Sequence, residues 1–293
     1  MLIVLLVVSG QILLGQTSEE PGDDLSIIGR LVGADVNRIA SVVRYHSAIL
    51  MTRTEQFEAA YEALQQLVFQ ENTSPKVIEA LGLSILRMPF LPSEYPPGKR
   101  ELVLLAGRAA YAMADRRAED ADRLFQELVS RYPEESSLHY AYGVFLLGGD
   151  PGKALQYFHR ELMTDPRHVP SLLQIALEYL RQGKHEDALP LAEKAHALAP
   201  DFFTCRKVLG RIFLEIGETE RAIQELERGV ELAPDDHEMH FALSRAYARA
   251  GRKEDAGRER REFLRLDGIY RSRREGAQAV GGLKLPKKLL PRP

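Results

Sequence analysis

The sequence predicts an all-α protein, a right-handed alpha-alpha superhelix (solenoid) of stacked helical hairpins. Proline recurs about every 34 residues, at Pro133, Pro166, Pro200 and Pro234, and each ends an apolar segment of helical character. Because proline cannot continue a helix, this regular spacing predicts a helix end at the same place in every repeat. No segment shows the strict alternation of apolar and polar residues that is typical of a half-buried strand.

Two further sets of small residues recur with the same period. Alanine lies twelve residues before each helix end, and another small residue lies near the middle of the preceding helix. The first set is Ala121, Ala154, Ala188, Ala222 and Ala256, and the second is Ala109, Gly143, Ala176, Gly210 and Ser244. Small side chains on both helices let two backbones approach closely where they cross, as an antiparallel hairpin requires.

Glycines at Gly183, Gly217 and Gly251 follow the first helix of three repeats, where the chain must adopt the left-handed conformation that ends a helix. The fourth repeat carries the pattern Leu209, Gly210, Phe213, Gly217, Ala222, Leu226, Gly229 and Pro234. This pattern resembles the tetratricopeptide repeat (TPR), a 34-residue helical hairpin. We expect five such repeats, at about 102–135, 136–168, 169–202, 203–236 and 237–270. The second is one residue short, and the first carries Arg108 where an apolar residue is expected.

The two ends of the chain differ from the repeats in composition. Residues 1–16 are almost wholly apolar and have the length of a signal peptide, although no Lys or Arg precedes the apolar run. We expect them to direct export, to the periplasm or the extracellular space; the alternative is a buried first helix in a cytoplasmic protein. Residues 17–34 are predicted to form an acidic linker, and residues 271–293 a basic, disordered tail.

The region before the repeats is predicted to be helical and then extended. Residues 35–88 are predicted to hold two amphipathic helices, at about 36–51 and 54–69, which resemble a degenerate repeat, and another helix at about 76–87. Residues 89–100 are rich in proline and cannot form a regular helix. We expect them to be an ordered linker or a strap across the first repeats, which occupy residues 101–270 together.

The resemblance to TPR proteins implies a concave groove lined by the first helix of each hairpin. Carried over position by position, it predicts ten groove residues, namely Tyr140, Val144, Leu173, Leu177, Arg181, Lys207, Arg211, Phe241, Arg245 and Arg249. The earlier part of this groove is apolar and the later part is basic. A guanidinium binds a carboxylate through two hydrogen bonds, so the basic end suits a partner's acidic side chain or free C-terminus. The alternative is that Arg211 and Arg245 are solvated, or pair with Glu215 and Glu238.

Composition and net charge give little support for several other classes of partner and site. A net charge of −3 and a pI near 6.3 give no reason to expect a nucleic-acid partner. The basic residues of the tail could touch an anionic membrane surface, for which four charges are marginal. Cys205 is the single cysteine, so the chain can form neither an intramolecular disulfide nor a cysteine-based zinc site. We expect Cys205 to be a buried small residue.

No set of residues in the sequence matches a catalytic or cofactor-binding motif. The segment from His237 to His240 superficially resembles a zinc-protease helix, but its histidines are three residues apart rather than four. His240 and His139 share one repeat position, which is expected to pack between helices. We therefore expect no enzyme activity, no metal and no cofactor.

Two functions from different classes remain. The favoured one is a non-catalytic protein–protein interaction scaffold whose concave TPR groove binds a peptide or a helix of its partner. The alternative is an accessory subunit of a cell-envelope assembly or an enzyme complex. Such a subunit would use its convex face and residues 20–99 more than its groove.

Overall fold

The computed structural model describes residues 24–69, 74–92 and 94–282, and this part of the chain contains helices and no strand. The all-α prediction is therefore confirmed. The chain divides into two compact units, Met1–Val43 and Arg44–Pro293, and the second contains all the helices after α1. The predicted signal peptide, residues 1–16, lies outside the described residues.

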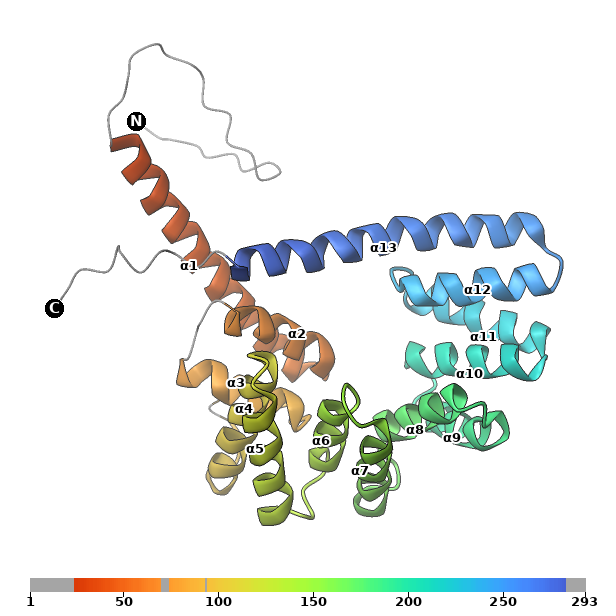
Figure 1. Ribbon diagram of the computed structural model, residues 1–293, viewed down its shortest axis with the longest axis horizontal. Helices are drawn as coiled ribbons and strands as arrows, with labels where there is room; N and C mark the ends of the chain where they lie inside the picture. The colour runs from red at the N-terminus through yellow and green to blue at the C-terminus, as the bar shows by residue number, and fades with distance from the viewer. Residues whose placement is uncertain (1–23, 70–73, 93, 283–293) are drawn as a thin grey trace, which may run out of the picture. The chain divides into compact units, whose positions relative to one another are not determined.

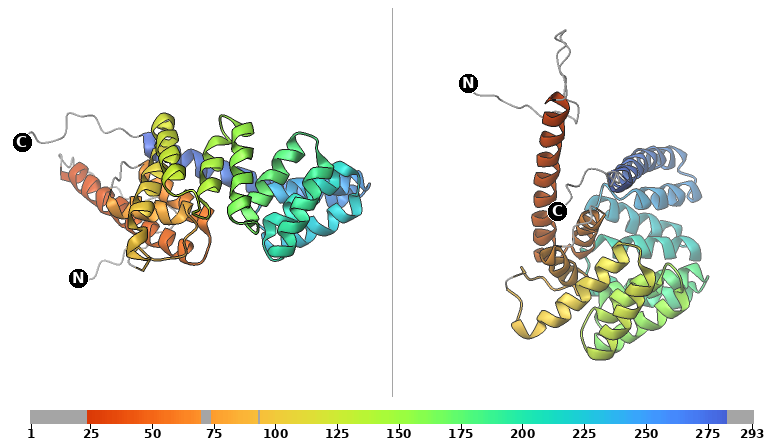
Figure 2. Two further views of the ribbon diagram at one scale, coloured as in Figure 1. Left: turned by 90° about the horizontal axis from the view of Figure 1, so that it is seen from below. Right: turned by 60° about the vertical axis from the view of Figure 1, so that its left-hand side comes forward.

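Three helices precede the repeats, and a short 3-10 helix leads into them. These are α1 (Asp24–Arg53), α2 (Phe57–Val68), α3 (Pro75–Ile85) and η1 (Pro97–Lys99). Five helical hairpins follow in the second unit, each hairpin packed against the next (Figures 1 and 2). Their helices are α4 (Arg100–Ala114) with α5 (Ala118–Arg131), α6 (Leu138–Leu146) with α7 (Pro151–Thr164), α8 (Val169–Arg181) with α9 (His185–Leu198), α10 (Phe203–Ile216) with α11 (Thr219–Leu232), and α12 (His237–Arg249) with α13 (Lys253–Gly282).

The recurring small residues lie where the two helices of a hairpin touch. A Cβ atom added at Gly210 of α10 would collide with Leu226 of α11, and one added at Gly143 of α6 would collide with Phe158 of α7. Four recurring alanines of the second helices, Ala121, Ala154, Ala188 and Ala222, are fully buried, and the fifth, Ala256, is partly buried. Apolar side chains from neighbouring hairpins then join into two cores. One spans α8 to α12, and the other joins α4 to α7 with residues 83–95.

Two helices extend beyond the ranges that the sequence predicted. α1 begins at Asp24, inside the predicted linker 17–34, because Leu25, Ile28 and Val32 continue the helical spacing of apolar residues directly after Pro21 and Gly22. α13 continues to Gly282, well into the predicted tail. Residues 271–280 contain no proline that would stop the helix, and the helix ends at the pair Gly281 and Gly282 that follows them. No helix in the described part of the chain is long and apolar enough to span a lipid bilayer.

The proline-rich segment before the repeats is packed against them. Met88 and Tyr95 are buried in the core that includes α4 to α7, and the Tyr95 hydroxyl donates a hydrogen bond to Glu79 of α3. The Arg53 guanidinium of α1 donates a hydrogen bond to the Pro89 carbonyl at 2.8 Å. The segment is thus a structural part of the second unit.

Candidate partner-binding groove

One side chain from each of four consecutive first helices occupies the ninth position of its repeat. We call these four residues, Val144 on α6, Leu177 on α8, Arg211 on α10 and Arg245 on α12, the groove row. Val144, Leu177 and Arg211 are half-buried, and Arg245 is exposed. Along the row the chemistry changes from two apolar side chains to two guanidinium groups. The chemistry of this repeat position therefore changes once, between α8 and α10.

Part of the apolar end of the predicted groove is covered by the protein itself. Tyr140 is only 9% exposed, and the guanidinium of Arg87 lies 5.8 Å from the centre of its ring. The same guanidinium lies 4.7 Å from the ring of Phe57 on α2, and it forms an ion pair with Glu58. Leu173 is also buried, at 3%. Tyr140 and Leu173 therefore present little surface to a partner in this conformation, whereas Val144 and Leu177 remain partly open.

A buried polar cluster lies behind Tyr140 and fixes the start of α6. Glu161 of α7 is fully buried, and its carboxylate accepts hydrogen bonds from the backbone N–H groups of Ser137 at 2.6 Å and Tyr140 at 3.1 Å. His168 lies 3.2 Å from the Ser137 hydroxyl and 2.9 Å from the Ser171 hydroxyl through its two ring nitrogens. Burial, and secondarily the charge of Arg87, lowers the pKa of His168 to about 4, so the imidazole is neutral at pH 7. The cluster positions the helix that carries Tyr140 and Val144.

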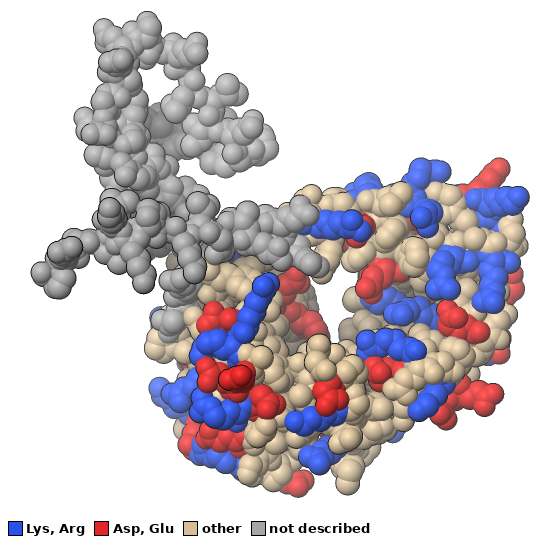
Figure 3. Space-filling model, viewed as in Figure 1, with Lys and Arg blue, Asp and Glu red and all other residues tan. Residues whose placement is uncertain are grey.

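Most cations at the basic end are already paired within the chain. Lys207 lies 2.8 Å from an Asp236 oxygen and 3.1 Å from a Glu238 oxygen. Arg245 lies 3.2 Å from Glu215, and Arg249 donates a hydrogen bond to the Leu214 carbonyl. Figure 3 shows acidic and basic side chains interspersed over these C-terminal hairpins.

Arg211 differs from the other cations at the basic end because it forms no ion pair or hydrogen bond with the described residues. The residue as a whole is half-buried, and its guanidinium keeps all five donors for a ligand. Of the remaining predicted groove residues, Arg181 pairs with Glu178, and Phe241 is 38% exposed and packs against Phe263 of α13. Arg211 and Phe241 are thus open to a partner. A role for any of the ten residues in binding stays a prediction.

Sequence reasoning did not find Arg87, which joins α2 to the groove. This residue lies between α3 and the proline-rich segment and has a left-handed backbone, with φ of 52°. A non-glycine residue with positive φ is uncommon, but the sequence carries no signal for it. Its contacts with Phe57 and Glu58 of α2 and with the ring of Tyr140 exist only in the folded chain.

The residues expected to be structural are buried. Cys205 is fully buried, and burial raises the pKa of its thiol to about 11, so the thiol stays protonated. His240 is 5% exposed and lies between the Pro234 carbonyl, at 2.9 Å, and the Glu259 carboxylate, at 2.7 Å. His139, at the same repeat position, is 7% exposed. The predicted packing role of these three residues is confirmed.

The hairpin stack and its recurring positions define an α-helical repeat protein. The tetratricopeptide-repeat family matches the chain at residues 104–167 and again at 179–245, and the chain is a TPR protein. Repeats of this kind typically form non-catalytic scaffolds for protein–protein interactions.

Solved structures of MamA share this fold. A double mutant titled MamA RS-1 ArsTM has 21% sequence identity and a TM-score of 0.50, and the match covers 58% of this chain and 96% of that one. MamA from Desulfovibrio magneticus RS-1, from residue 41 to its end, has 22% identity and a TM-score of 0.47, covering 58% and 94%. No curated protein matches the chain.

Proposed function

We propose that this chain is a non-catalytic scaffold that holds a partner protein, as an extended peptide or a helix, along the groove row. One observation carries the proposal: four consecutive first helices present the ninth position of their repeat as two apolar side chains and then two arginines. A partner that fits this row has an apolar segment followed by a carboxylate, from an acidic side chain or a free C-terminus.

The Arg211 guanidinium is the expected anchor for that carboxylate. Its half-buried position and free donors favour a bidentate hydrogen bond, which is stronger than one between neutral groups. Arg245 pairs with Glu215, and both side chains are exposed to solvent. A partner's carboxylate can therefore bind the guanidinium donors of Arg245 that Glu215 does not use. Lys207 has a different role in this proposal, because it holds the start of α12 through Asp236.

Charge reversal tests this proposal directly. We expect the double variant Arg211→Glu and Arg245→Glu to lose the partner protein that residues 17–293 capture from the native extract. Arg228→Glu on α11 is the matched control, because Arg228 is 70% exposed and lies outside the groove row. A capture profile that is the same for the double variant and the control would contradict the proposal, provided that circular dichroism shows both to be folded.

The same experiment separates the scaffold from an accessory subunit that binds through its convex face. Deleting residues 17–99 would not separate the two functions. The deletion would remove Leu83, Leu86 and Tyr95, which are buried in one core with the first two repeats. A partner that survives charge reversal of the groove row but is lost when Met163, 83% exposed on α7, is changed to Glu would favour the accessory subunit.

We further propose that the protein is exported, on the basis of the apolar residues 2–15 and the acidic residues that follow them. N-terminal sequencing of the native protein tests this proposal. A mature chain that begins near residue 16 would support it, and retention of Met1 in the protein from the cytoplasm would contradict it.

A further inference from the structure

One repeat position has a different chemistry in the first hairpin than in the other four. The seventh position is filled by a buried apolar or aromatic side chain in four first helices, namely Tyr142, Ile175, Leu209 and Leu243. Each of these side chains is at most 3% exposed. In α4 the same position holds Arg108, which is exposed.

In the second hairpin the side chain at the seventh position fills the space between two second helices. Tyr142 shows this, because its ring stacks on Phe125 of the preceding helix α5, at 5.3 Å, and contacts Tyr157 of its own partner helix α7, at 4.4 Å. In the first hairpin the preceding helix is α3, which crosses α4 backbone against backbone. A Cβ atom added at Gly82 of α3 would collide with the Val103 carbonyl group.

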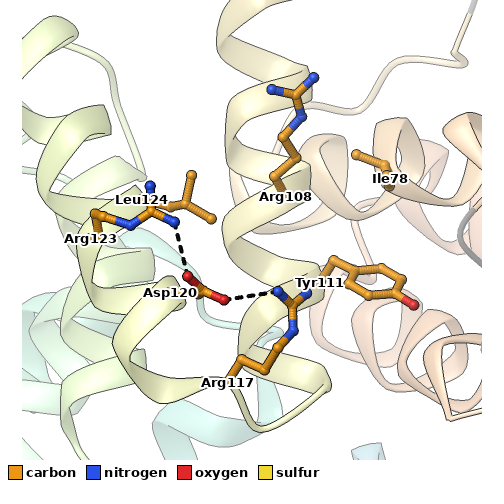
Figure 4. Close-up of a pocket in the computed structure, with 7 residues that line it drawn as sticks. All are labelled: Ile78, Arg108, Tyr111, Arg117, Asp120, Arg123 and Leu124. Atoms are coloured by element: carbon orange, nitrogen blue, oxygen red, sulfur yellow. Dashed lines mark hydrogen bonds and ion pairs between the residues drawn. The ribbon is translucent and has the colours of Figure 1, made fainter.

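A pocket of about 370 Å³ lies between α3, α4 and α5, beside Arg108. Its lining is Ile78 from α3, Arg108 and Tyr111 from α4, and Arg117, Asp120, Arg123 and Leu124 from the start of α5 (Figure 4). Pockets for small organic ligands begin at about 300 Å³. The pocket is therefore large enough for a small molecule. Its lining contains three arginines and one carboxylate, and a second carboxylate, Asp115, pairs with Arg117 from outside the lining.

Asp120 pairs with two of these arginines, and Asp115 takes the Nε donor of Arg117 at 2.8 Å, but the other donors of Arg123 stay unused. One of its oxygens lies 2.9 Å from Arg117 Nη1 and the other lies 2.9 Å from Arg123 Nη2 (Figure 4). Hydrogen bonds from Arg123 and then Arg117 hold the pKa of Asp120 below its usual range, so it stays ionised. Arg108 enters from α4 and forms no ion pair with the described residues. The pocket therefore keeps several unused guanidinium donors.

We propose that this pocket binds a small phosphate monoester whose organic group is aromatic or apolar. Arg108 and the unused donors of Arg123 bind the phosphate oxygens, in the planar geometry that guanidinium groups offer to phosphate, while Asp115 and Asp120 hold Arg117 in place. The apolar walls, Ile78 and Leu124, and the ring of Tyr111 contact the organic group. The pocket lies outside the groove row, so this site is independent of the proposed scaffold function.

Phenyl phosphate is the probe for this site, measured by titration calorimetry on the folded chain at low salt. We expect saturable binding that Arg108→Gln weakens about 30-fold, since one charge-assisted hydrogen bond to the ligand is lost. Arg228→Gln on α11 is the matched control and should bind as the wild-type chain does. Equal affinity in Arg108→Gln and Arg228→Gln, or no saturable binding by the wild-type chain, would overturn the proposal.

Three further measurements separate the site from general attraction of anions. Inorganic phosphate should bind at least 10-fold more weakly than phenyl phosphate, and equal affinity would contradict the role of the apolar walls. The affinity for phenyl phosphate should fall as the pH drops below about 6, where the phosphate takes up its second proton. Arg108→Leu, which restores the apolar pattern of the other repeats, should abolish binding, and unchanged binding in this variant would also overturn the proposal.

Discussion

The N-terminal and C-terminal hairpins reach the same backbone geometry by different means. After the first helix, the last three hairpins place Gly183, Gly217 and Gly251 in the left-handed conformation, with φ between 74° and 88°. The first hairpin places Arg116 at that repeat position, with φ of 59°. Because a side chain disfavours this conformation, packing imposes it on Arg116, whereas glycine adopts it readily.

The starts of the first helices show the same contrast. α12 is capped locally, because the Asp236 carboxylate accepts a hydrogen bond from the Met239 N–H at 2.9 Å. α6 has no cap from its own N-terminal residue, and the distant Glu161 of α7 accepts the hydrogen bonds of its first turn instead. The start of α12 thus depends on a residue next to it in the sequence, and the start of α6 on a contact between helices.

The largest expected effect comes from the two caps. Glu161→Ala leaves two buried N–H groups without acceptors, and we expect it to lower the free energy of unfolding by about 4 kcal/mol. Asp236→Ala removes a local cap and the ion pair with Lys207, for which we expect a loss of about 1–2 kcal/mol. Urea denaturation of the full chain measures both losses. Equal losses would remove the distinction between distant and local capping.

The second prediction compares two close helix contacts. At Gly82 an alanine Cβ would meet the Val103 backbone, which cannot move without shifting α4. At Gly210 it would meet the Leu226 side chain, which can shift. We expect Gly82→Ala to cost about 3 kcal/mol and Gly210→Ala about 1 kcal/mol or less, as read from their urea midpoints. A reversed order would show that the α3–α4 contact is not the tighter of the two.

The third prediction concerns acid sensitivity at the N-terminal side. The pKa of His168 is about 4 in the folded chain and 6.5 as its ordinary value, so the folded state binds fewer protons between these values. The stability that this group contributes is complete above about pH 6.5 and is lost as the pH falls towards 4. We expect the wild-type chain to lose up to about 3 kcal/mol over this range relative to His168→Asn. Parallel pH profiles of the two proteins would contradict a buried, neutral His168.

The smallest expected effect is a gain in stability at the first turn. Arg116→Gly relieves the left-handed strain but makes the unfolded chain more flexible, so we expect a net gain of about 0.5 kcal/mol. Gly217→Ala at the same repeat position should instead cost about 1 kcal/mol. The melting temperatures of the two variants, compared with that of the wild-type chain, give the sign of each change in stability. A loss of stability in Arg116→Gly would show that the Arg116 side chain contributes a stabilising contact.

The contrast between the two regions also explains what could be predicted from the sequence. The turn glycines, the small residues at the crossings and the closing prolines are local signals, and they were sufficient to predict the all-α repeat fold. The contact of Arg87 with Tyr140, the burial of Leu173 and the internal pairing of Lys207 with Asp236 depend on helices far apart in sequence. Repeat position alone therefore predicts a groove face but not which of its side chains are open to a partner.

Site-specific photo-crosslinking tests most directly whether the groove row binds the partner. A photoreactive phenylalanine analogue would replace Leu177, in the middle of the row, and separately Met163, exposed on the second helix α7. We predict that the analogue at position 177 crosslinks the captured partner in the native extract and that the analogue at position 163 does not. Crosslinking from position 163 alone would contradict binding along the groove row.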